Sequence, residues 1–306
     1  MKRVLALIAV SAAAFGSTVL AACIGDEPGA LPPIPQKDGG DSDTYVPPDN
    51  HDAGPPVPQE VDGLLLWLDG ADSNSVQRKK PGTDETVVKW VDKSAKKNDY
   101  APRAPEKAPK FAPGSMNGNT MSSVVFSNAG GTYLVGPVIS SAEAEAFVVL
   151  HPAKRTIGLP PDAKVAYGLW QFGKLASAHP NANGHVQDSF GSLSDQTFFG
   201  AVAAQYGSIS SPHIYSVVAT QHSWDCFFNG ALVNLNRPNP YKPGFNPNGS
   251  LLGASNNDSP LEPNQFFNGY IAEVIIYGKQ LPPADHDKIQ AYLAAKWGIA
   301  LNDGGT

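Results

Sequence analysis

The sequence predicts an all-β sandwich that forms one domain and ends in a single α-helix. Three observations predict it. The 306 residues include 28 prolines and 30 glycines, an excess over average usage that favours turns and argues against a helical bundle. From Val61 onward, short apolar runs alternate with clusters of Gly, Asn, Pro and Asp, as in sandwiches and barrels. Helical spacing is convincing only over residues 283–297.

Residues 1–22 predict a lipoprotein signal peptide. Lys2 and Arg3 precede an uncharged, apolar stretch, residues 4–22, which is the pattern of a secretory signal. A transmembrane helix is the alternative, but residues 16–18 interrupt the stretch and no second apolar run follows. The run Leu-Ala-Ala-Cys23 resembles a bacterial lipobox, which implies lipidation of Cys23 and cleavage just before it. An ordinary secretory signal with an incidental cysteine is the other alternative.

Lipidation of Cys23 would leave Cys226 as the one other cysteine, so no disulfide is expected. Several acyl chains on one residue give a nearly permanent membrane anchor. Ile24 follows Cys23 and is not the Asp that resembles an inner-membrane retention signal. We therefore expect a lipid-anchored protein of the bacterial cell envelope, located at the outer membrane.

Residues 23–60 predict the lipidated cysteine followed by a disordered linker. The segment after Cys23 contains nine prolines and eight acidic residues against one basic residue, so it cannot bury enough apolar surface to fold. Most of the chain's net charge of −6 lies in it. This balance excludes a nucleic-acid binder with a basic surface, and it leaves the domain at residues 61–306 nearly neutral, without electrostatic steering.

Eleven strands are expected in this domain. The turn Asn229-Gly230 predicts a type I′ hairpin, because both residues tolerate positive φ. In the strand before it, Cys226 shares a face with Trp224 and Phe228, which predicts a buried, unreactive thiol. The expected strands are Gly63–Leu68, Val87–Val91, Ser123–Phe126, Ala146–Leu150, Ala166–Phe172, Val186–Phe190, Phe199–Gln205, Ile214–Ala219, Trp224–Phe228, Ala231–Asn234 and Tyr270–Tyr277.

The one expected helix is Pro283–Trp297. Ile289, Leu293 and Trp297 recur at four-residue spacing and form an apolar stripe. Gly298 directly after them predicts a left-handed cap. We expect this helix to pack across the sandwich.

Three stretches resemble the concanavalin A-like lectin/glucanase superfamily, in particular laminin G-like jelly-roll domains of bacterial secreted proteins and lipoproteins. The resemblance implies a curved jelly-roll sandwich of two antiparallel sheets, a fold that serves carbohydrate binding, adhesion and glycan cleavage. The stretches are GLLLWLD from Gly63 with WVDKS from Trp90 and Asn98-Asp99, the hairpin at Asn229-Gly230, and FNGYIAEVIIY from Phe267 continuing to YLAAKWG from Tyr292.

The glucanases of this superfamily carry their carboxylates as Glu-x-Asp-x-x-Glu on one strand, because a retaining mechanism needs them about 5 Å apart. No such arrangement occurs: Glu143 and Glu145 lack a partner Asp, and apolar residues follow Glu273. The sequence also lacks a Gly-x-Ser-x-Gly elbow and a phosphate-binding loop. We therefore expect no catalysis; a glycan-active hydrolase or lyase with an atypical carboxylate pair is the alternative.

No cofactor is expected, and calcium is the one metal that stays open. The histidine spacings do not fit a zinc site. Calcium prefers six to eight oxygen ligands, and two of the family-like segments hold several carboxylate and amide oxygens. The same side chains could instead cap turns. The candidate calcium ligands are Asp69, Asp72, Asp92, Asn98 and Asp99.

Loop aromatics beside amides are the candidates for glycan binding, because a flat ring stacks on the apolar face of a sugar while Asn and Asp take its hydroxyls. We expect a surface-anchored lipoprotein whose laminin G-like domain binds a glycan or a protein partner. A structural envelope protein is the alternative from another class. The candidate ligand-binding residues are Tyr206, Tyr241, Phe245, Asn256, Asn257 and Asp258.

Overall fold

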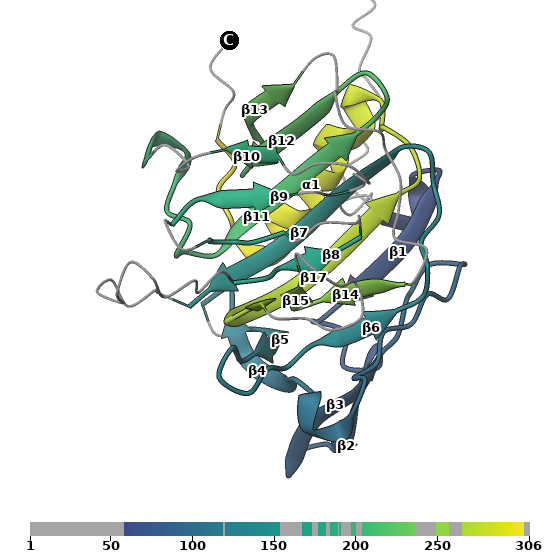
Figure 1. Ribbon diagram of the computed structural model, residues 1–306, viewed down its shortest axis with the longest axis vertical. Helices are drawn as coiled ribbons and strands as arrows, with labels where there is room; N and C mark the ends of the chain where they lie inside the picture. Colours follow the sequence, from purple (N-terminus) through teal and green to yellow (C-terminus); the bar gives the residue numbers. More distant parts are fainter. Residues whose placement is uncertain are drawn as a thin grey trace, which may run out of the picture. The chain divides into compact units, whose positions relative to one another are not determined.

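The computed structural model describes residues 58–302, except residues 119, 154–166, 173–176, 182–183, 189, 191–196, 200–203, 237–248 and 257–264 (Figure 1). In these residues the strands pair antiparallel, and one α-helix, α1 (Pro283–Trp297), follows the last strand. The predicted antiparallel sandwich with a C-terminal helix is confirmed. Within the described part of the chain, no helix is long and apolar enough to cross a membrane.

A ten-stranded sheet forms the centre of the fold; nine of its strands follow the order β13-β12-β11-β7-β17-β5-β4-β3-β2, and the tenth, β1, pairs with β17. Strand β17 (Gly269–Tyr277) pairs with β7 along one edge; on its other edge β5 pairs with its first residues and β1 with its last. The remaining bounds are β1 (Leu64–Asp69), β2 (Val76–Lys80), β3 (Asp84–Trp90), β4 (Lys110–Met116), β5 (Met121–Phe126), β7 (Ala144–Pro152), β11 (His213–Ala219), β12 (Trp224–Phe228) and β13 (Ala231–Asn236).

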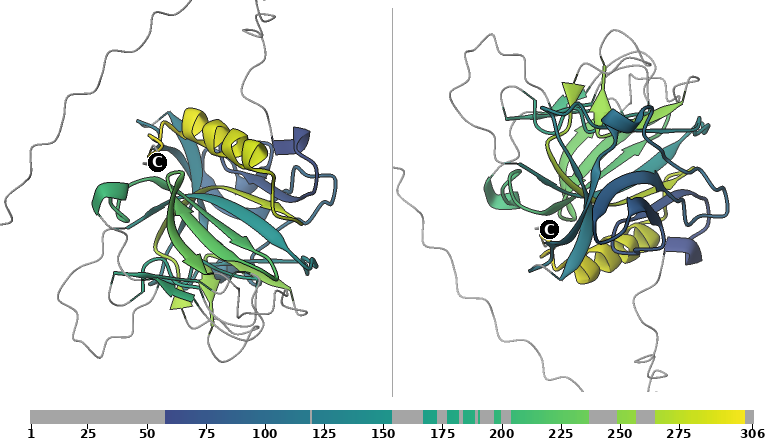
Figure 2. Two further views of the ribbon diagram at one scale, coloured as in Figure 1. Left: turned by 90° about the horizontal axis from the view of Figure 1, so that it is seen from above. Right: turned by 90° about the horizontal axis from the view of Figure 1, so that it is seen from below.

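Shorter strands make up the second layer. They form a three-stranded sheet, β6-β14-β8, and two pairs, β9 with β10 and β15 with β16. Figure 2 shows these strands on one face of the large sheet and α1 against the opposite face. The bounds are β6 (Leu134–Gly136), β8 (Trp170–Gln171), β9 (Val186–Asp188), β10 (Thr197–Phe199), β14 (Ser250–Leu252), β15 (Ala254–Ser255) and β16 (Gln265–Phe266).

Because both faces of the large sheet are covered, its central strands are buried throughout. In β7, Ala146 and Val148 face the core between the two layers. The alternating residues Phe147 and Val149 pack with α1 in a second apolar cluster. This is why β7 is a continuous apolar run and not the alternating pattern of a half-exposed strand.

The hairpin and the helix cap form where the sequence predicts them. Asn229 and Gly230 have φ of 49° and 84° between β12 and β13, as a type I′ turn requires. Gly298 ends α1 with φ 64° and donates its N–H to the carbonyl of Ala294. A Cβ there would lie 2.2 Å from the Asn117 side chain, so this position also needs glycine for space. Cys226 is fully buried, as predicted.

Several strands differ from those expected. Of the expected strand at residues 166–172, β8 is the part described as a strand. Most of the expected strand at residues 199–205 lies outside the described residues; Phe199 belongs to β10, and Ala204–Tyr206 form a 3₁₀ turn, η3. Strand β2 was not predicted because its sequence, VQRKK, is mostly charged, and β4 because it contains Pro113 and Gly114. Both strands lie toward one edge of the sheet, where a polar or interrupted sequence is tolerated.

The described part of the chain begins at Pro58, three residues before the expected boundary at Val61. Residues Pro58–Glu60 form a 3₁₀ turn, η1, in which Pro58 is buried. The Tyr277 hydroxyl, at the end of β17, donates a hydrogen bond of 2.9 Å to the Pro58 carbonyl. The end of the segment expected as linker is thus fastened to the domain.

Candidate functional site

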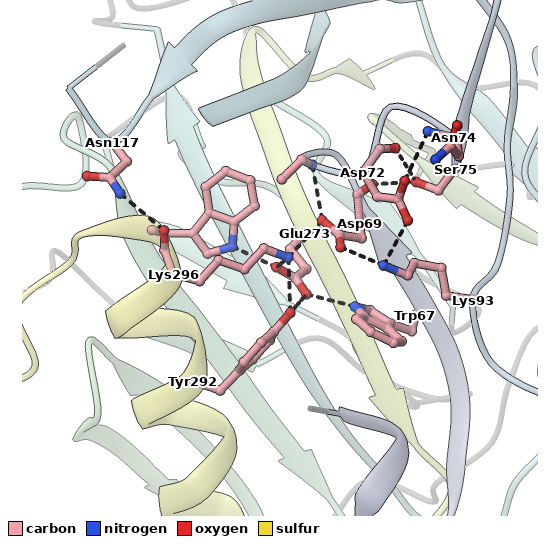
Figure 3. Close-up of polar contacts among 12 residues, drawn as sticks. Trp67, Asp69, Asp72, Asn74, Ser75, Lys93, Asn117, Glu273, Tyr292 and Lys296 are labelled. Carbon is pink, nitrogen blue, oxygen red and sulfur yellow. Dashed lines mark hydrogen bonds and ion pairs between the residues drawn. The ribbon is translucent and has the colours of Figure 1, made fainter. Parts of the chain in front are cut away.

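A buried carboxylate, Glu273, joins the helix to the large sheet. Glu273 is fully buried in β17. Its Oε1 accepts hydrogen bonds from Trp67 Nε1 at 2.7 Å and from the Tyr292 hydroxyl at 2.8 Å. Its Oε2 accepts from Trp297 Nε1 and lies beside the Lys296 ammonium, both at 2.7 Å. Figure 3 shows Glu273 between Trp67 and the helix residues Tyr292 and Lys296. We call these five residues and Asp69 the helix-side cluster.

Alternating charges extend from Glu273 to the surface. Lys296 Nζ lies 2.7 Å from Asp69 Oδ1. Asp69 Oδ2 pairs with Lys93 at 2.9 Å, and Lys93 reaches Asp72 at 3.0 Å. Each buried carboxylate therefore faces a cation, which compensates the cost of removing the charges from water.

The pKa values in this cluster follow from burial and from these contacts. Burial raises the pKa of Glu273, and the charge of Lys296 only partly counters it. The pKa of the Tyr292 hydroxyl is also raised, first by burial and then by the negative charge of Glu273. Burial alone would lower the pKa of Lys93, but hydrogen bonds to Asp69 and Asp72 outweigh it and raise that pKa. Tyr292 thus stays a donor and Lys93 a cation.

Asp92 organises the turn that follows β3. Its Oδ1 accepts the backbone N–H groups of Trp67 and Ser94, both at 2.8 Å. Its Oδ2 accepts the Ser94 hydroxyl at 2.6 Å and the N–H of Asn98 at 2.7 Å. Asp99 accepts the N–H of Asp92 and pairs with Lys89 at 3.2 Å. These side chains join the turn to β1.

The candidate calcium ligands therefore divide between two structural roles. Asp69 and Asp72 hold lysines, whereas Asp92, Asn98 and Asp99 fix a turn. The residues do not offer the open shell of oxygens that calcium needs, since their oxygens already face protein donors. Across the described residues, no group of three or more His, Cys, Asp or Glu is placed to hold a metal ion. The geometry fits the turn-capping alternative.

A second buried carboxyl, Asp188 at the end of β9, lies on the other face of the large sheet. Its Oδ1 accepts Trp170 Nε1 at 3.1 Å, the Phe190 N–H at 2.9 Å and the Ser177 hydroxyl. Its Oδ2 accepts the Tyr215 hydroxyl at 2.8 Å. Burial raises the pKa of Asp188, and these hydrogen bonds only partly counter it. No described cation contacts it.

Two buried imidazoles lie beside Tyr215, which donates to this carboxyl; the ring centroids of His179 and Tyr215 are 5.1 Å apart. His179 Nε2 and His213 Nε2 are 2.8 Å apart, and His213 Nδ1 lies 2.7 Å from the Ser211 carbonyl. A carbonyl only accepts, so His213 carries its proton on Nδ1 and His179 donates from Nε2. Burial lowers the pKa of His213 to about 4 and that of His179 well below its usual value. We call Trp170, Ser177, His179, Asp188, His213 and Tyr215 the core-side cluster.

Two of the candidate glycan-binding residues lie within the described part of the chain. Tyr206 is half-buried in η3, and its carbonyl accepts a hydrogen bond from Asn302. Asn256 is buried, and its backbone bonds the Gln171 side chain. Of these two residues, only Tyr206 is partly exposed. The remaining candidates, Tyr241, Phe245, Asn257 and Asp258, lie outside the described residues.

An open groove lies where β2 and β3 form one edge of the large sheet. Its volume is about 520 Å³, which falls in the range of small-ligand sites. Val88 on its floor is 45% exposed, a high value for a large apolar side chain. Lys79 and Arg103 are exposed at the groove. Its lining consists of Lys79, Thr86, Val87, Val88, Pro102, Arg103, Ala104, Pro105 and Ala108, with no carboxylate.

A second hollow of about 320 Å³ lies at the turn between β11 and β12. Its lining is polar and includes a single carboxylate, Glu143. Neither hollow therefore presents the pair of carboxylates that glycoside hydrolysis requires. The residues that line it are Glu143, Thr220, His222, Ser223 and Gln280.

Sequence reasoning did not identify the groove or the two buried clusters. Their residues come from distant parts of the chain; Trp67 and Glu273, for example, are 206 positions apart. The sequence does contain one feature that points to the groove, which is a local excess of basic residues. Residues 76–110 hold ten Lys or Arg against five Asp or Glu, in a domain whose total charge is close to zero.

Solved structures with the same fold include two binding domains of bacterial toxins. The binding domain of Paraclostridial Mosquitocidal Protein 1 matches with a TM-score of 0.50 and 13% identity, over 76% of this chain and 53% of that one. The botulinum neurotoxin serotype C1 binding domain matches with a TM-score of 0.50 and 12% identity, over 76% and 52%. The likeness is one of fold. This chain spans about half the length of each neighbour.

No protein-family model matches the sequence, and no curated protein matches it.

Proposed function

We propose that this chain is a lipid-anchored, non-catalytic binding protein whose laminin G-like domain takes a glycan in the groove beside β3. The groove carries the proposal. It is the larger of the two hollows described above, it exposes Val88 on its floor, and it has two long cationic side chains. Apolar side chains can cover the C–H face of a sugar ring while Lys79 and Arg103 bond its oxygens.

The positions of the acidic side chains support binding without catalysis. Glu273 and Asp188 are buried and accept four hydrogen bonds or ion pairs each. Glu145 is buried too, and it contacts His286 and the Leu281 N–H. A general acid must reach the glycosidic oxygen of its substrate. These three carboxyls could do so only if the fold opened.

The fold neighbours support the same reading at a coarser level, since both are named as binding domains. They do not supply a ligand for this chain. Each is about twice as long as the matched region, so what the whole neighbour binds need not involve the shared half. The ligand has to be argued from the groove itself.

The anchor is the second part of the proposal, and it rests on Cys23. We propose a cell-envelope location, at the outer membrane, with a linker that separates the domain from the lipid surface. Cys23→Ser should abolish incorporation of labelled palmitate, because no other cysteine lies near the cleavage site. Equal labelling of the variant and the wild type would overturn the anchor and leave the groove untouched.

Binding is tested with the full chain, purified in detergent, on a panel of immobilised polysaccharides. We expect dissociation constants in the micromolar to millimolar range, as shallow sites give. Ala104→Trp should fill the groove and weaken binding at least about tenfold. Leu232→Trp is the matched control, since Leu232 is 44% exposed on β13, the opposite edge strand of the sheet. Both variants should have the same melting temperature as the wild-type protein, which would show that they are folded.

Two outcomes would overturn this proposal. If Ala104→Trp binds normally while the double variant Tyr241→Ala, Phe245→Ala does not, the site lies in the loop that the sequence suggested. Release of sugars from any polysaccharide of the panel would favour the alternative, a hydrolase or lyase. A structural envelope protein would instead retain no polysaccharide and would capture an envelope protein.

A further inference from the structure

We infer that the groove selects an acidic polysaccharide, whose carboxylate or sulfate groups are bound by Lys79 and Arg103. This inference rests on the proposed function and adds the chemical class of its ligand. It follows from three properties of the groove: the charge of its surroundings, the state of its cations, and its shape.

The surroundings of the groove are positive although the domain as a whole is not. Of the residues in segment 76–110, ten are Lys or Arg and five are Asp or Glu. The fold brings them together, because β2, β3 and β4 are neighbours in the sheet and the segment 91–109 connects β3 to β4. A local excess of one sign raises the concentration of oppositely charged ligands near a site.

Two acidic side chains of this segment pair with cations outside the groove, and a third, Asp84, lies closer to Lys110 than to the groove residue Lys79. Glu85 pairs with Arg78 at 3.0 Å, and Asp99 pairs with Lys89. Asp84 lies 3.3 Å from Lys110. Hydrogen bonds from Thr86 hold the pKa of Asp84 far below its usual value, so its charge is permanent.

The side chains of both groove cations reach the surface. Lys79 reaches Asp84 only at 3.7 Å, and its side chain is 65% exposed. Arg103 is exposed between Pro102 and Ala104, all of which line the groove. Arg presents a planar fork that matches a carboxylate or sulfate in two parallel hydrogen bonds, and Lys adds a point charge. A polysaccharide with one anionic group on each sugar could bind both the Lys79 ammonium and the Arg103 guanidinium.

The shape of the groove favours a polysaccharide over a lipid surface. A flat layer of headgroups is best met by cations on a protruding face. Here the surface is hollowed, and Val88 and alanine and proline side chains make up much of its lining. A sugar ring can lie in such a groove with its carboxylate toward the rim, which a phospholipid headgroup in a bilayer cannot do.

Sodium polygalacturonate and its methyl-esterified form test the inference, because they share a backbone and differ in charge. The full chain should bind the acid form at least about tenfold more tightly, and raising the salt from roughly 50 mM to roughly 500 mM should remove most of this preference. The double variant Lys79→Gln, Arg103→Gln should bind both forms equally. Lys288→Gln, an exposed lysine of α1 paired with Asp285 at 2.8 Å, controls for the loss of a charge.

The outcomes separate this inference from the proposed function. Equal binding of both polymers, blocked by Ala104→Trp, would overturn the acidic class and keep the glycan site. Retention on phosphatidylglycerol vesicles through Lys79 and Arg103, without binding of polygalacturonate, would assign the groove to a lipid surface and overturn the inference. Failure to bind any polysaccharide, charged or neutral, would overturn the proposed function and the inference with it.

Discussion

The helix-side and core-side clusters each bury a carboxyl group against one face of the same sheet, but they neutralise it differently. Glu273 faces Lys296, which in turn faces Asp69. Asp188 receives four hydrogen bonds from neutral groups and no described cation. Burial raises the pKa of both carboxyls. The difference shows where the fold keeps charge: at the helix, and not in the core between the layers.

This contrast has a cause in the sequence. Lys296 lies in the last turn of α1, where a cation also stabilises the helix dipole, and its long side chain reaches the sheet from there. The core between the layers is filled by aromatic side chains such as Trp170 and Tyr215, whose N–H and O–H groups are the available donors. Both carboxyls have a full set of hydrogen-bond donors, but only Glu273, which faces Lys296, needs to carry a negative charge.

Replacing each carboxyl by an amide tests the contrast, and Glu273→Gln should have the largest effect. One oxygen becomes an NH₂ group that faces at least one donor that cannot accept: the Trp67 Nε1–H on one side, or the Trp297 Nε1–H and the Lys296 ammonium on the other. Because Lys296 also loses half of its compensation, the free energy of unfolding should fall by about 3 kcal/mol. Urea unfolding of the full chain measures it.

Acidification should have the next largest effect, through the core-side cluster. The pKa of His213 is about 4 in the folded protein against 6.5 for the free side chain, so the unfolded chain binds more protons between these values. The contribution of His213 to the free energy of unfolding is fully present above about pH 6.5. As the pH falls toward 4 this contribution is lost, and the free energy of unfolding falls by about 3 kcal/mol. His213→Gln should flatten this part of the profile. An unchanged slope in that variant would mean that other groups cause the acid sensitivity.

Asp188→Asn should cost less than Glu273→Gln, about 1 kcal/mol. Its amide oxygen can keep the three donors on Oδ1, and its NH₂ group can donate to the Tyr215 hydroxyl, which reverses its role. The same urea titration compares the two variants. If Asp188→Asn were the more damaging, the charge of Asp188 would matter and the contrast between the clusters would fail.

Calcium should have the smallest effect of all. Asp69, Asp72 and Asp92 already accept protein donors, so calcium in excess over a chelator should shift the melting temperature by less than about 1 °C. A rise of several degrees that Asp92→Asn abolishes would restore the calcium site that the sequence left open.

The sequence predicted those parts of the fold that depend on neighbouring residues. Asn229-Gly230 forces its hairpin by backbone preference alone, and the stripe of Ile289, Leu293 and Trp297 defines α1 to the residue. The strands of the buried centre were also found, because both faces are apolar. What failed were edge strands such as β2, whose charged residues follow no apolar pattern and gain their order from pairing with β3.

The site could not be predicted in the same way. Glu273 stands in an apolar strand and was considered only as a catalytic residue, since the sequence does not show that Trp67, Tyr292 and Lys296 surround it. The groove forms only because the fold brings Lys79 of β2 and Arg103, from the segment between β3 and β4, to the same hollow. The loop candidates Tyr241 and Phe245 remain a prediction, and so does Tyr206, whereas Asn256 is buried.

The pairing of β1 with β17 sets the order in which this protein can be assembled. The first strand of the sheet finds its partner only when residues 273–277 have been synthesised, and the Trp67–Glu273 contact closes a loop of 206 residues. Contacts of such separation are slow to form. A nascent chain therefore holds its first strand unpaired until nearly the whole domain exists, so this sheet is completed late in synthesis.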